Sequence, residues 1–162
     1  MRWFTHKSVA LAGAAWLGVG LPGLAGVAAG SILPDSLDMA LAGRDRRRFQ
    51  RIHRGVTHWG GWYIGLFFIV PLLRLRLVMP AGTADIAVDF GLGLALGALS
   101  HVLLDSLNPS GVPLFPLRKK PRLSLNLVST GSWGELVFLF AALGLLGAKW
   151  DTLRGAVAAF LR

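Results

Sequence analysis

Histidine and aspartate are the residues of this chain whose types and spacing could do chemistry. Seven of them lie at or near the ends of apolar stretches: His6, Asp35, Asp38, His53, His58, His101 and Asp105. His101 and Asp105 are spaced i, i+4, which on a helix points both side chains from one face toward a common metal ion. Because the chain has no cysteine, any divalent metal must be held by imidazole and carboxylate groups, which suit zinc.

The same seven side chains have a second interpretation that involves no metal. The aspartates can neutralise neighbouring arginines, and the histidines can lie in the headgroup zone of a membrane. Against this, ionisable groups near a bilayer are costly unless they are partnered. The pattern therefore predicts a site for one or two divalent cations, most simply zinc, although manganese and iron accept the same donors.

The composition indicates that these groups are positioned by a membrane protein. Of the 162 residues, 54% are hydrophobic and only 15% are charged, and the mean hydropathy is +0.58. A soluble domain carries about a quarter charged residues, so a soluble enzyme is nearly excluded. Four apolar stretches, 8–33, 59–79, 84–104 and 133–150, approach the roughly 20 residues that a spanning helix needs. We therefore expect an all-α integral membrane protein with one domain over residues 1–162.

The cations place the expected site relative to the membrane. Segments 44–54 and 118–122 hold ten of the 17 lysines and arginines and bracket two apolar stretches, so both segments lie on one side. The positive-inside rule makes that side cytoplasmic, in a multi-pass protein of a bacterial-type inner membrane. His58 and His101 fall on the same side, and the site is therefore expected at the cytoplasmic membrane surface.

The first apolar stretch is interrupted at Gly20–Gly23, where Pro22 lies between two glycines. The two pieces are too short to cross a hydrocarbon core alone, which fits a re-entrant helical hairpin as well as a kinked spanning helix. A cleavable signal peptide is a third interpretation of the same residues. Charge bias favours the hairpin, which brings His6 to the other ligands and leaves three transmembrane helices.

Other polar and small residues lead to structural expectations. The Pro-, Ser- and Asn-rich segment 106–132 is expected to be irregular, and residues 152–162 are expected to form a short amphipathic helix. The Gly93-x-x-x-Gly97 pair predicts the close approach of a second helix. Glu135 lies near the start of the last apolar stretch, which together with the tail covers residues 133–162, and it is a candidate additional metal ligand.

Four motifs in one order resemble the YdjM-type membrane-bound metal-dependent hydrolases, a family of small inner-membrane proteins. The motifs are Thr5–His6, Gly30–Asp38, His53–His58 and Ser100–Asp105, the last followed by Asn108–Pro116. Each motif is short, but the four together over residues 5–117 are specific. Residues 118–162 carry only an apolar span. The resemblance implies a metal-dependent hydrolase.

That family is in turn similar to the zinc-dependent phospholipases C and single-strand nucleases, which are helical enzymes that hydrolyse phosphodiesters. The likeness implies two metal ions bridged by Asp105. The other implied ligands are Asp35, His101 and either His58 or His53 at one ion, and His6 at the second. No histidine follows Asp105, and Trp3 is not the first residue, so neither a third zinc nor a terminal amine ligand is expected.

The likeness to phospholipases, together with a metal site at headgroup depth, implies that metal-activated water cleaves a phosphoester or phosphodiester of a membrane lipid. Asp38 is expected to orient a ligand histidine or to act as the base for that water. Its structural alternatives are a helix cap or a partner for neighbouring arginines. Arg54 is expected to clamp a phosphate, and its alternative is a solvated loop residue.

Two other classes of function compete with this hypothesis. A non-enzymatic membrane protein, either a metal-stabilised scaffold or a small transporter, has the same composition, although a transporter needs polar groups at the membrane midplane. A membrane-anchored nuclease shares the metal site but needs a basic groove, for which strong salt dependence of binding is the test. Membrane lipids are the expected partners, and nucleic acid is the less favoured one.

Overall fold

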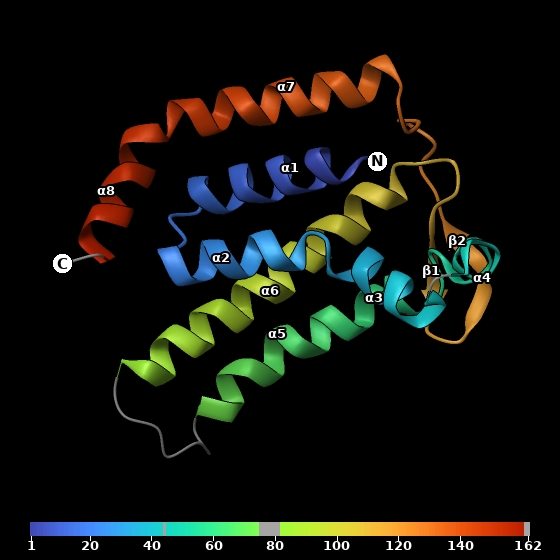
Figure 1. Ribbon diagram of the computed structural model, residues 1–162, viewed down its shortest axis with the longest axis horizontal. Helices are drawn as coiled ribbons and strands as arrows, with labels where there is room; N and C mark the ends of the chain where they lie inside the picture. The colour runs from blue at the N-terminus through green and yellow to red at the C-terminus, as the bar shows by residue number, and fades with distance from the viewer. Residues whose placement is uncertain (44, 75–81, 161–162) are drawn as a thin grey trace.

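The computed structural model describes residues 1–43, 45–74 and 82–160, and it is mostly helical (Figure 1). The elements are α1 Trp3–Trp16, α2 Leu21–Gly30, α3 Leu33–Ala42, α4 Arg46–Ile52, the short 3₁₀ helix η1 Val56–His58, α5 Gly60–Arg74, α6 Thr83–Ser106, β1 Val112–Phe115, β2 Arg118–Leu123, α7 Trp133–Ala148 and α8 Trp150–Phe160. Parts of three segments discussed above lie outside the described residues. They are Arg44 of the first basic segment, residues 75–79 of the second apolar stretch, and residues 161–162 of the tail.

The long helices lie side by side in the order α7, α1, α2, α6 and α5, and each packs against its neighbours in this row (Figure 1). The short elements α3, α4, β1 and β2 gather at one end of the row, together with the N-terminus. This end holds the histidine-rich motifs of the sequence, so the row of helices is the scaffold that positions them.

One described helix is long and apolar enough by itself to cross a membrane, over Asp85–Ser106 of α6. The pairs α2 with α3 and α7 with α8 pass the same test together, but they are bent by 44° and 59°. Each bent pair is either a broken span or a re-entrant segment, so the described residues contain from one to three candidate spans. The predicted mostly helical fold with at least one membrane-capable helix is confirmed, and the predicted three spans stay a prediction.

The N-terminal stretch forms an antiparallel helical hairpin, because α2 returns along α1 (Figure 1). The break falls at residues 17–20, just before the predicted Gly20–Gly23, and Gly18 takes the left-handed backbone conformation there (φ 72°). Pro22 lies in the first turn of α2, where its missing N–H leaves no intrahelical hydrogen bond unmade. The hairpin therefore returns the chain to the end from which it started.

Glycines allow α2 and α6 to lie in direct backbone contact. A Cβ atom at Gly97 would overlap the carbonyl oxygen of Val27, and one at Gly30 would overlap the carbonyl oxygen of Leu94. Gly93 meets the backbone of α2 in the same way, so the close approach predicted from the Gly93-x-x-x-Gly97 pair is confirmed. The contact fixes the end of α2 against the part of α6 that carries His101.

The segment expected to be wholly irregular, 106–132, contains a two-stranded antiparallel sheet. Strand β1 pairs with β2, with Val112 opposite Leu123 and Phe115 opposite Arg118, and the register shifts between Pro113 and Phe115. The all-α expectation is therefore wrong for this short segment. The turn-forming residues that suggested an irregular loop lie mostly before β1 and within the hairpin, where they reverse the chain and leave short extended runs between them.

Candidate metal centre

The predicted ligands converge at one end of the helix row although they come from five elements. His6 lies on α1, Asp35 and Asp38 on α3, His53 follows α4, His58 ends η1, and His101 and Asp105 lie on the last turns of α6. All except His53 are buried. Two groups of potential metal-ligating atoms lie within reach of a single ion, namely Asp35, Asp38, His53 and His58, and His6, His101 and Asp105.

Four side chains drawn from these two groups bring potential ligand atoms close to one another. Asp35 Oδ1 lies 3.3 Å from His58 Nε2 and 3.6 Å from His101 Nε2. Asp105 Oδ2 lies 3.7 Å from His58 Nε2 and 3.6 Å from His101 Nε2. Neighbouring ligands of a tetrahedral zinc ion, bound at about 2.0–2.1 Å, are separated by about 3.3–3.4 Å. These four aspartate–histidine separations are therefore close to those between neighbouring ligands of a zinc ion.

Three of these four atoms also lack an ordinary hydrogen-bond partner. Among the described residues, no group forms a hydrogen bond with Asp35 Oδ1, His58 Nε2 or His101 Nε2, although all three are buried. Buried polar atoms are nearly always partnered, because leaving one unpartnered costs about 1–3 kcal/mol. A divalent cation would satisfy all three atoms at once, so the donor set fits a metal ion.

The second ring nitrogen of His101 is held by the backbone. His101 Nδ1 lies 2.7 Å from the carbonyl oxygen of Ser31, at the end of α2. A carbonyl oxygen can only accept, so Nδ1 carries the proton and Nε2 presents its lone pair to the centre. The glycine contact between α2 and α6 brings this carbonyl within reach.

His58 is held in the same state by its own neighbours. The Thr57 hydroxyl donates to Asp38 Oδ1, so it can only accept from His58 Nδ1, which lies 3.1 Å away. Asp38 Oδ2 lies 3.4 Å from the same nitrogen. Burial lowers the pKa of His58 below its usual value of 6.5, which keeps the imidazole neutral near pH 7. A neutral ring with Nε2 free is the form that binds metal.

Asp105 divides its two oxygens between two environments. Oδ2 faces His58 and His101, whereas Oδ1 accepts from Arg54 Nη2 at 2.9 Å and from Asn108 Nδ2 at 3.2 Å. The amino group of Met1 lies 3.3 Å from Oδ1, and His6 Nε2 lies 3.5 Å from it. This crowding on the Oδ1 side favours one ion, held on the Oδ2 side, over two.

His6 is buried beside the four-atom group and stacks on His101, with ring centroids 3.9 Å apart. Among the described residues, neither of its ring nitrogens has a hydrogen-bond partner. The hairpin formed by α1 and α2 brings it there. Its position next to Asp105 Oδ1 is where a second ion would lie.

His53 and Asp38 lie at the outer side of the group. His53 Nδ1 is 3.1 Å from Asp38 Oδ2 and 3.6 Å from Asp35 Oδ1, and its side chain is 29% exposed. Asp38 also accepts from the backbone N–H of Arg54. Asp38 therefore supports the loop that carries both histidines.

Glu135 has other partners than the metal-ligating groups. Its carboxylate accepts from the Thr5 hydroxyl at 2.9 Å and from the backbone N–H groups of Arg2 and Gly131. It thereby ties α7 to the first turn of α1, where Thr5 directly precedes His6. Its observed role is to hold the N-terminal helix in place.

A polar pocket of about 560 Å³ is lined by Arg54 and Asn108, both of which donate to Asp105. Its walls include His53, Arg54, Arg122 and the hydroxyls of Ser129 and Thr130. Arg122 donates to the carbonyl oxygens of Gly111 and Arg54, and burial together with the charge of Arg54 lowers the pKa of its guanidinium. Two cations with one nearby carboxylate favour the entry of an anion into this pocket.

Several groups at the site could not be identified from the sequence pattern. Trp3 Nε1 donates to Asp35 Oδ2 at 2.9 Å, a contact that no motif in the sequence indicated. The Ser31 carbonyl is a backbone atom, to which no sequence signal points. Asn108 and Arg122 were visible only as parts of a turn and a basic run. For these groups, only the fold shows the role.

A helical protein with a membrane-capable helix that buries a cluster of histidines and aspartates is the class that this fold and site define. Comparison with known families makes the assignment specific. The chain matches the family described as YdjM inner membrane protein over residues 1–161, and it belongs to that family. No curated protein and no solved structure matches the chain. The likeness to phospholipases C and nucleases therefore stays a prediction.

Proposed function

We propose that the chain is a metal-dependent hydrolase that cleaves a phosphoester, with the metal ion held by Asp35, His58, His101 and Asp105. The observation that carries this proposal is that neighbouring buried ligand atoms, Asp35 Oδ1, His58 Nε2 and His101 Nε2, have no hydrogen-bond partner within the described part of the chain. Zinc is the proposed ion, because two imidazoles and two carboxylates form a donor set that suits it. Such an ion, when bound, lowers the pKa of water to about 7 and stabilises charge on a phosphoryl oxygen.

The arginines of the polar pocket are proposed to bind the phosphate. Arg54 and Arg122 both line the pocket, and among the described residues the buried Nε of each has no hydrogen-bond partner. Guanidinium groups bind phosphate through charge-assisted hydrogen bonds, so the two side chains are proposed to supply the positive charge and the N–H donors for it. Arg54 Nη2 already contacts Asp105, which places a bound phosphate next to the proposed ion.

His53 is proposed to carry the proton that the leaving group needs. It lines the same pocket, it is partly exposed, and Asp38 orients its Nδ1. An imidazole that is oriented by a carboxylate and open to a pocket can protonate an alkoxide leaving group. In this scheme His58 is the metal ligand, His53 is the proton donor, and Asp38 positions both.

A lipid phosphoester is the proposed substrate class. The cluster lies at the end of α6, whose segment Asp85–Ser106 can cross a membrane, so the site is proposed at headgroup depth on the cytoplasmic side. A polar pocket beside an apolar helix bundle suits a headgroup whose chains stay in the bilayer. This placement distinguishes the proposal from a nuclease, which needs a groove that reaches water.

Metal content and turnover, measured together on purified protein, test the proposal. Wild-type protein is expected to retain close to one zinc ion per chain and to hydrolyse phospholipid or an aryl phosphodiester. His101→Ala and Asp105→Ala are expected to lose both the metal and the activity. Arg54→Gln is expected to keep the metal and to lose about 10²-fold or more in kcat/KM, because it removes a charged contact to the phosphate.

Asp89→Asn is the matched control, because Asp89 lies on the same helix and is exposed away from the cluster. It is expected to behave as wild type. Bound metal that is lost in both cluster variants, without turnover of either substrate in wild type, would contradict the hydrolase and favour a metal-stabilised scaffold. Protein that binds no divalent ion would contradict the whole proposal.

A further inference from the structure

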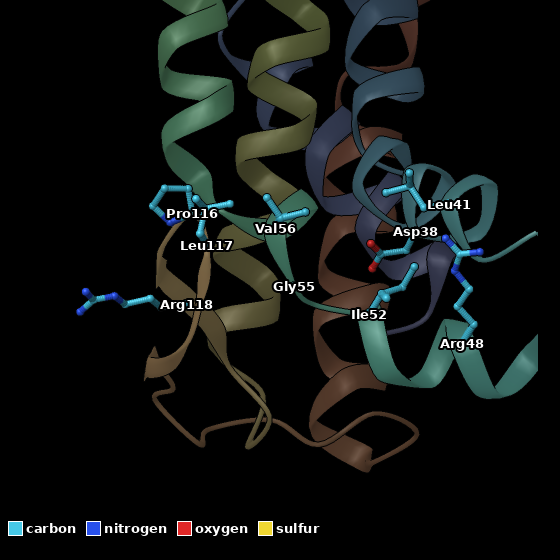
Figure 2. Close-up of a pocket in the computed structure, with 9 residues that line it drawn as sticks. All are labelled: Asp38, Leu41, Arg48, Ile52, Gly55, Val56, Pro116, Leu117 and Arg118. Atoms are coloured by element: carbon cyan, nitrogen blue, oxygen red, sulfur yellow. The ribbon is translucent and has the colours of Figure 1, made fainter.

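A second pocket is lined by Ile52 and Gly55, the residues that flank His53 and Arg54. Its lining is mainly apolar, whereas that of the first pocket is mainly polar. It measures about 340 Å³ and is formed where α3, α4 and η1 face the turn between β1 and β2 (Figure 2). Its walls are mainly apolar, and the lining residues are Asp38, Leu41, Arg48, Ile52, Gly55, Val56, Pro116, Leu117 and Arg118. The volume falls at the lower end of the range for small-molecule pockets, about 300–1,000 Å³.

Positive charge is available at the edge of this apolar pocket. The Arg48 guanidinium lies on the side of Leu41 and Asp38, whereas the Arg118 guanidinium points away from the other lining residues (Figure 2). Asp38 lines the pocket, but its carboxylate is buried and is engaged by Thr57, His53 and Arg54. Arg48 is exposed, so it can bind an anionic group at the mouth while the apolar walls contact a hydrocarbon chain.

The surroundings of the pocket are those of a membrane surface. Leu114, Phe115 and Leu117 of the β-hairpin expose 45%, 51% and 88% of their area, and cationic residues follow directly at 118–120. Exposed apolar side chains of this size mark a surface that another apolar phase covers. Clusters of lysine and arginine next to membrane helices attract anionic lipids. The partner that matches both features is an anionic phospholipid.

We propose that this pocket binds an anionic phospholipid of the surrounding membrane, with one acyl chain against Ile52, Val56 and Leu117 and the phosphate at Arg48. The lipid site goes beyond the proposed hydrolysis, because it binds lipid whether or not the metal centre is active. It lies next to that centre, since Asp38 forms a wall of the pocket and also contacts His53 and His58.

Protection of a single thiol tests the lipid site directly. The chain has no cysteine, so Val56→Cys introduces one reactive group into the pocket wall. The protein is stripped of metal with a chelator and reconstituted in nanodiscs of phosphatidylcholine, with or without phosphatidylglycerol. We expect phosphatidylglycerol to slow alkylation of this thiol about fivefold, as it does when the site is about four-fifths occupied. Because metal is absent, the readout does not depend on hydrolysis.

Two matched variants complete the design. Arg48→Gln in the Val56→Cys background is expected to abolish the protection, whereas Arg47→Gln, on the same helix but outside the pocket lining, is expected to retain it. Leu125→Cys, exposed on the segment after β2, controls for a general change in thiol reactivity and is expected to react equally in both discs.

Equal alkylation of the pocket thiol in the two kinds of nanodisc would overturn the proposal, and so would protection that persists in Arg48→Gln. Protection by phosphatidylcholine alone would also overturn it, because the occupant would then be a neutral lipid. Protection in the stripped protein, together with absence of turnover in the metal-loaded wild-type protein, would support the lipid site and count against the hydrolase, so the two proposals fail separately.

Discussion

At the scale of single residues, the candidate centre depends on carboxylates that face two ways. Asp105 presents one oxygen to two imidazoles and the other to Arg54, and Asp35 presents one oxygen to the same imidazoles and the other to Trp3. Each carboxylate is thereby fixed in rotation before any ion binds. Fixed ligands lose less conformational entropy on binding, which favours tight and selective coordination.

Asp38→Asn tests the support beneath the ligands. The amide keeps the size of the side chain but removes the charge that faces His53 and His58. We expect zinc affinity to fall by 10–100-fold, the usual cost of removing a carboxylate that orients a ligand histidine. Competition with a fluorescent zinc chelator measures the change. Asp151→Asn on α8, whose side chain is almost fully exposed, should leave the affinity within error, and an unchanged affinity in Asp38→Asn would remove the positioning role.

The sequence predicted the histidines and aspartates of the site better than it predicted the groups that orient them. The i, i+4 pair of His101 and Asp105 and the short His53–His58 motif were visible as spacings. The choice between His53 and His58 could not be made, because both precede the same apolar stretch. The structure separates them by direction: His58 Nε2 points at the four-atom group, and His53 lines the polar pocket.

At the scale of elements, the packing of α2 on α6 sets the depth of the site. Four glycines allow the two backbones to touch, and this contact places the last turn of α2 beside His101. The Gly93-x-x-x-Gly97 spacing predicted a close neighbour but did not say which helix it would be. That information requires the hairpin, whose break was visible, and the return of α2 along α6, which was not.

Gly97→Leu tests the role of this contact. The new side chain would overlap the backbone at Val27, so the helices must separate. Such overpacking costs about 1–3 kcal/mol or more, and we expect lower thermal stability together with loss of bound metal. Gly144→Leu on α7 is the matched control, because nothing lies within 4 Å of a Cβ atom there. Retention of full metal content by Gly97→Leu would show that the site tolerates displacement of α2.

At the scale of the whole molecule, the metal is expected to bind only the folded chain, because its proposed ligands come from α3, η1 and α6. Composition alone predicted a helical membrane protein, and charge predicted that one end of it would be basic. The convergence of ligands from residue 6 to residue 105 could not be derived from spacing, because each intervening turn contributes to it. The short hairpin of β1 and β2 was missed because the turn-forming residues of segment 106–132 indicated only an irregular loop.

Removal of the metal should therefore lower the melting temperature. At 100 times its dissociation constant, a ligand that binds only the native state adds about 2.7 kcal/mol. For a chain of this size that corresponds to roughly 5–10 °C, which thermal unfolding with and without a chelator can measure. His101→Ala should show no such difference. Equal melting temperatures of the wild-type protein with and without chelator would contradict a bound structural ion.

The same measurement has a defined pH dependence. Burial lowers the pKa of His58 in the folded state, so as the pH falls below about 6.5 the unfolded chain takes up the proton first. The contribution of His58 to the free energy of unfolding is thus fully present above that pH and is lost progressively below it. Protons also compete with metal for the imidazole, so the difference between metal-bound and chelated protein should shrink in acid.

The contact between His101 and the Ser31 carbonyl has a consequence for genetics. The acceptor is a peptide oxygen, so any amino acid at position 31 that preserves the helix end supplies it equally well. A saturation screen would score that position by steric tolerance alone, and the partner that sets the tautomer of His101 would stay invisible to it. Only substitutions that displace the backbone at the end of α2, such as replacements of the glycines that pack α2 on α6, can reveal the dependence.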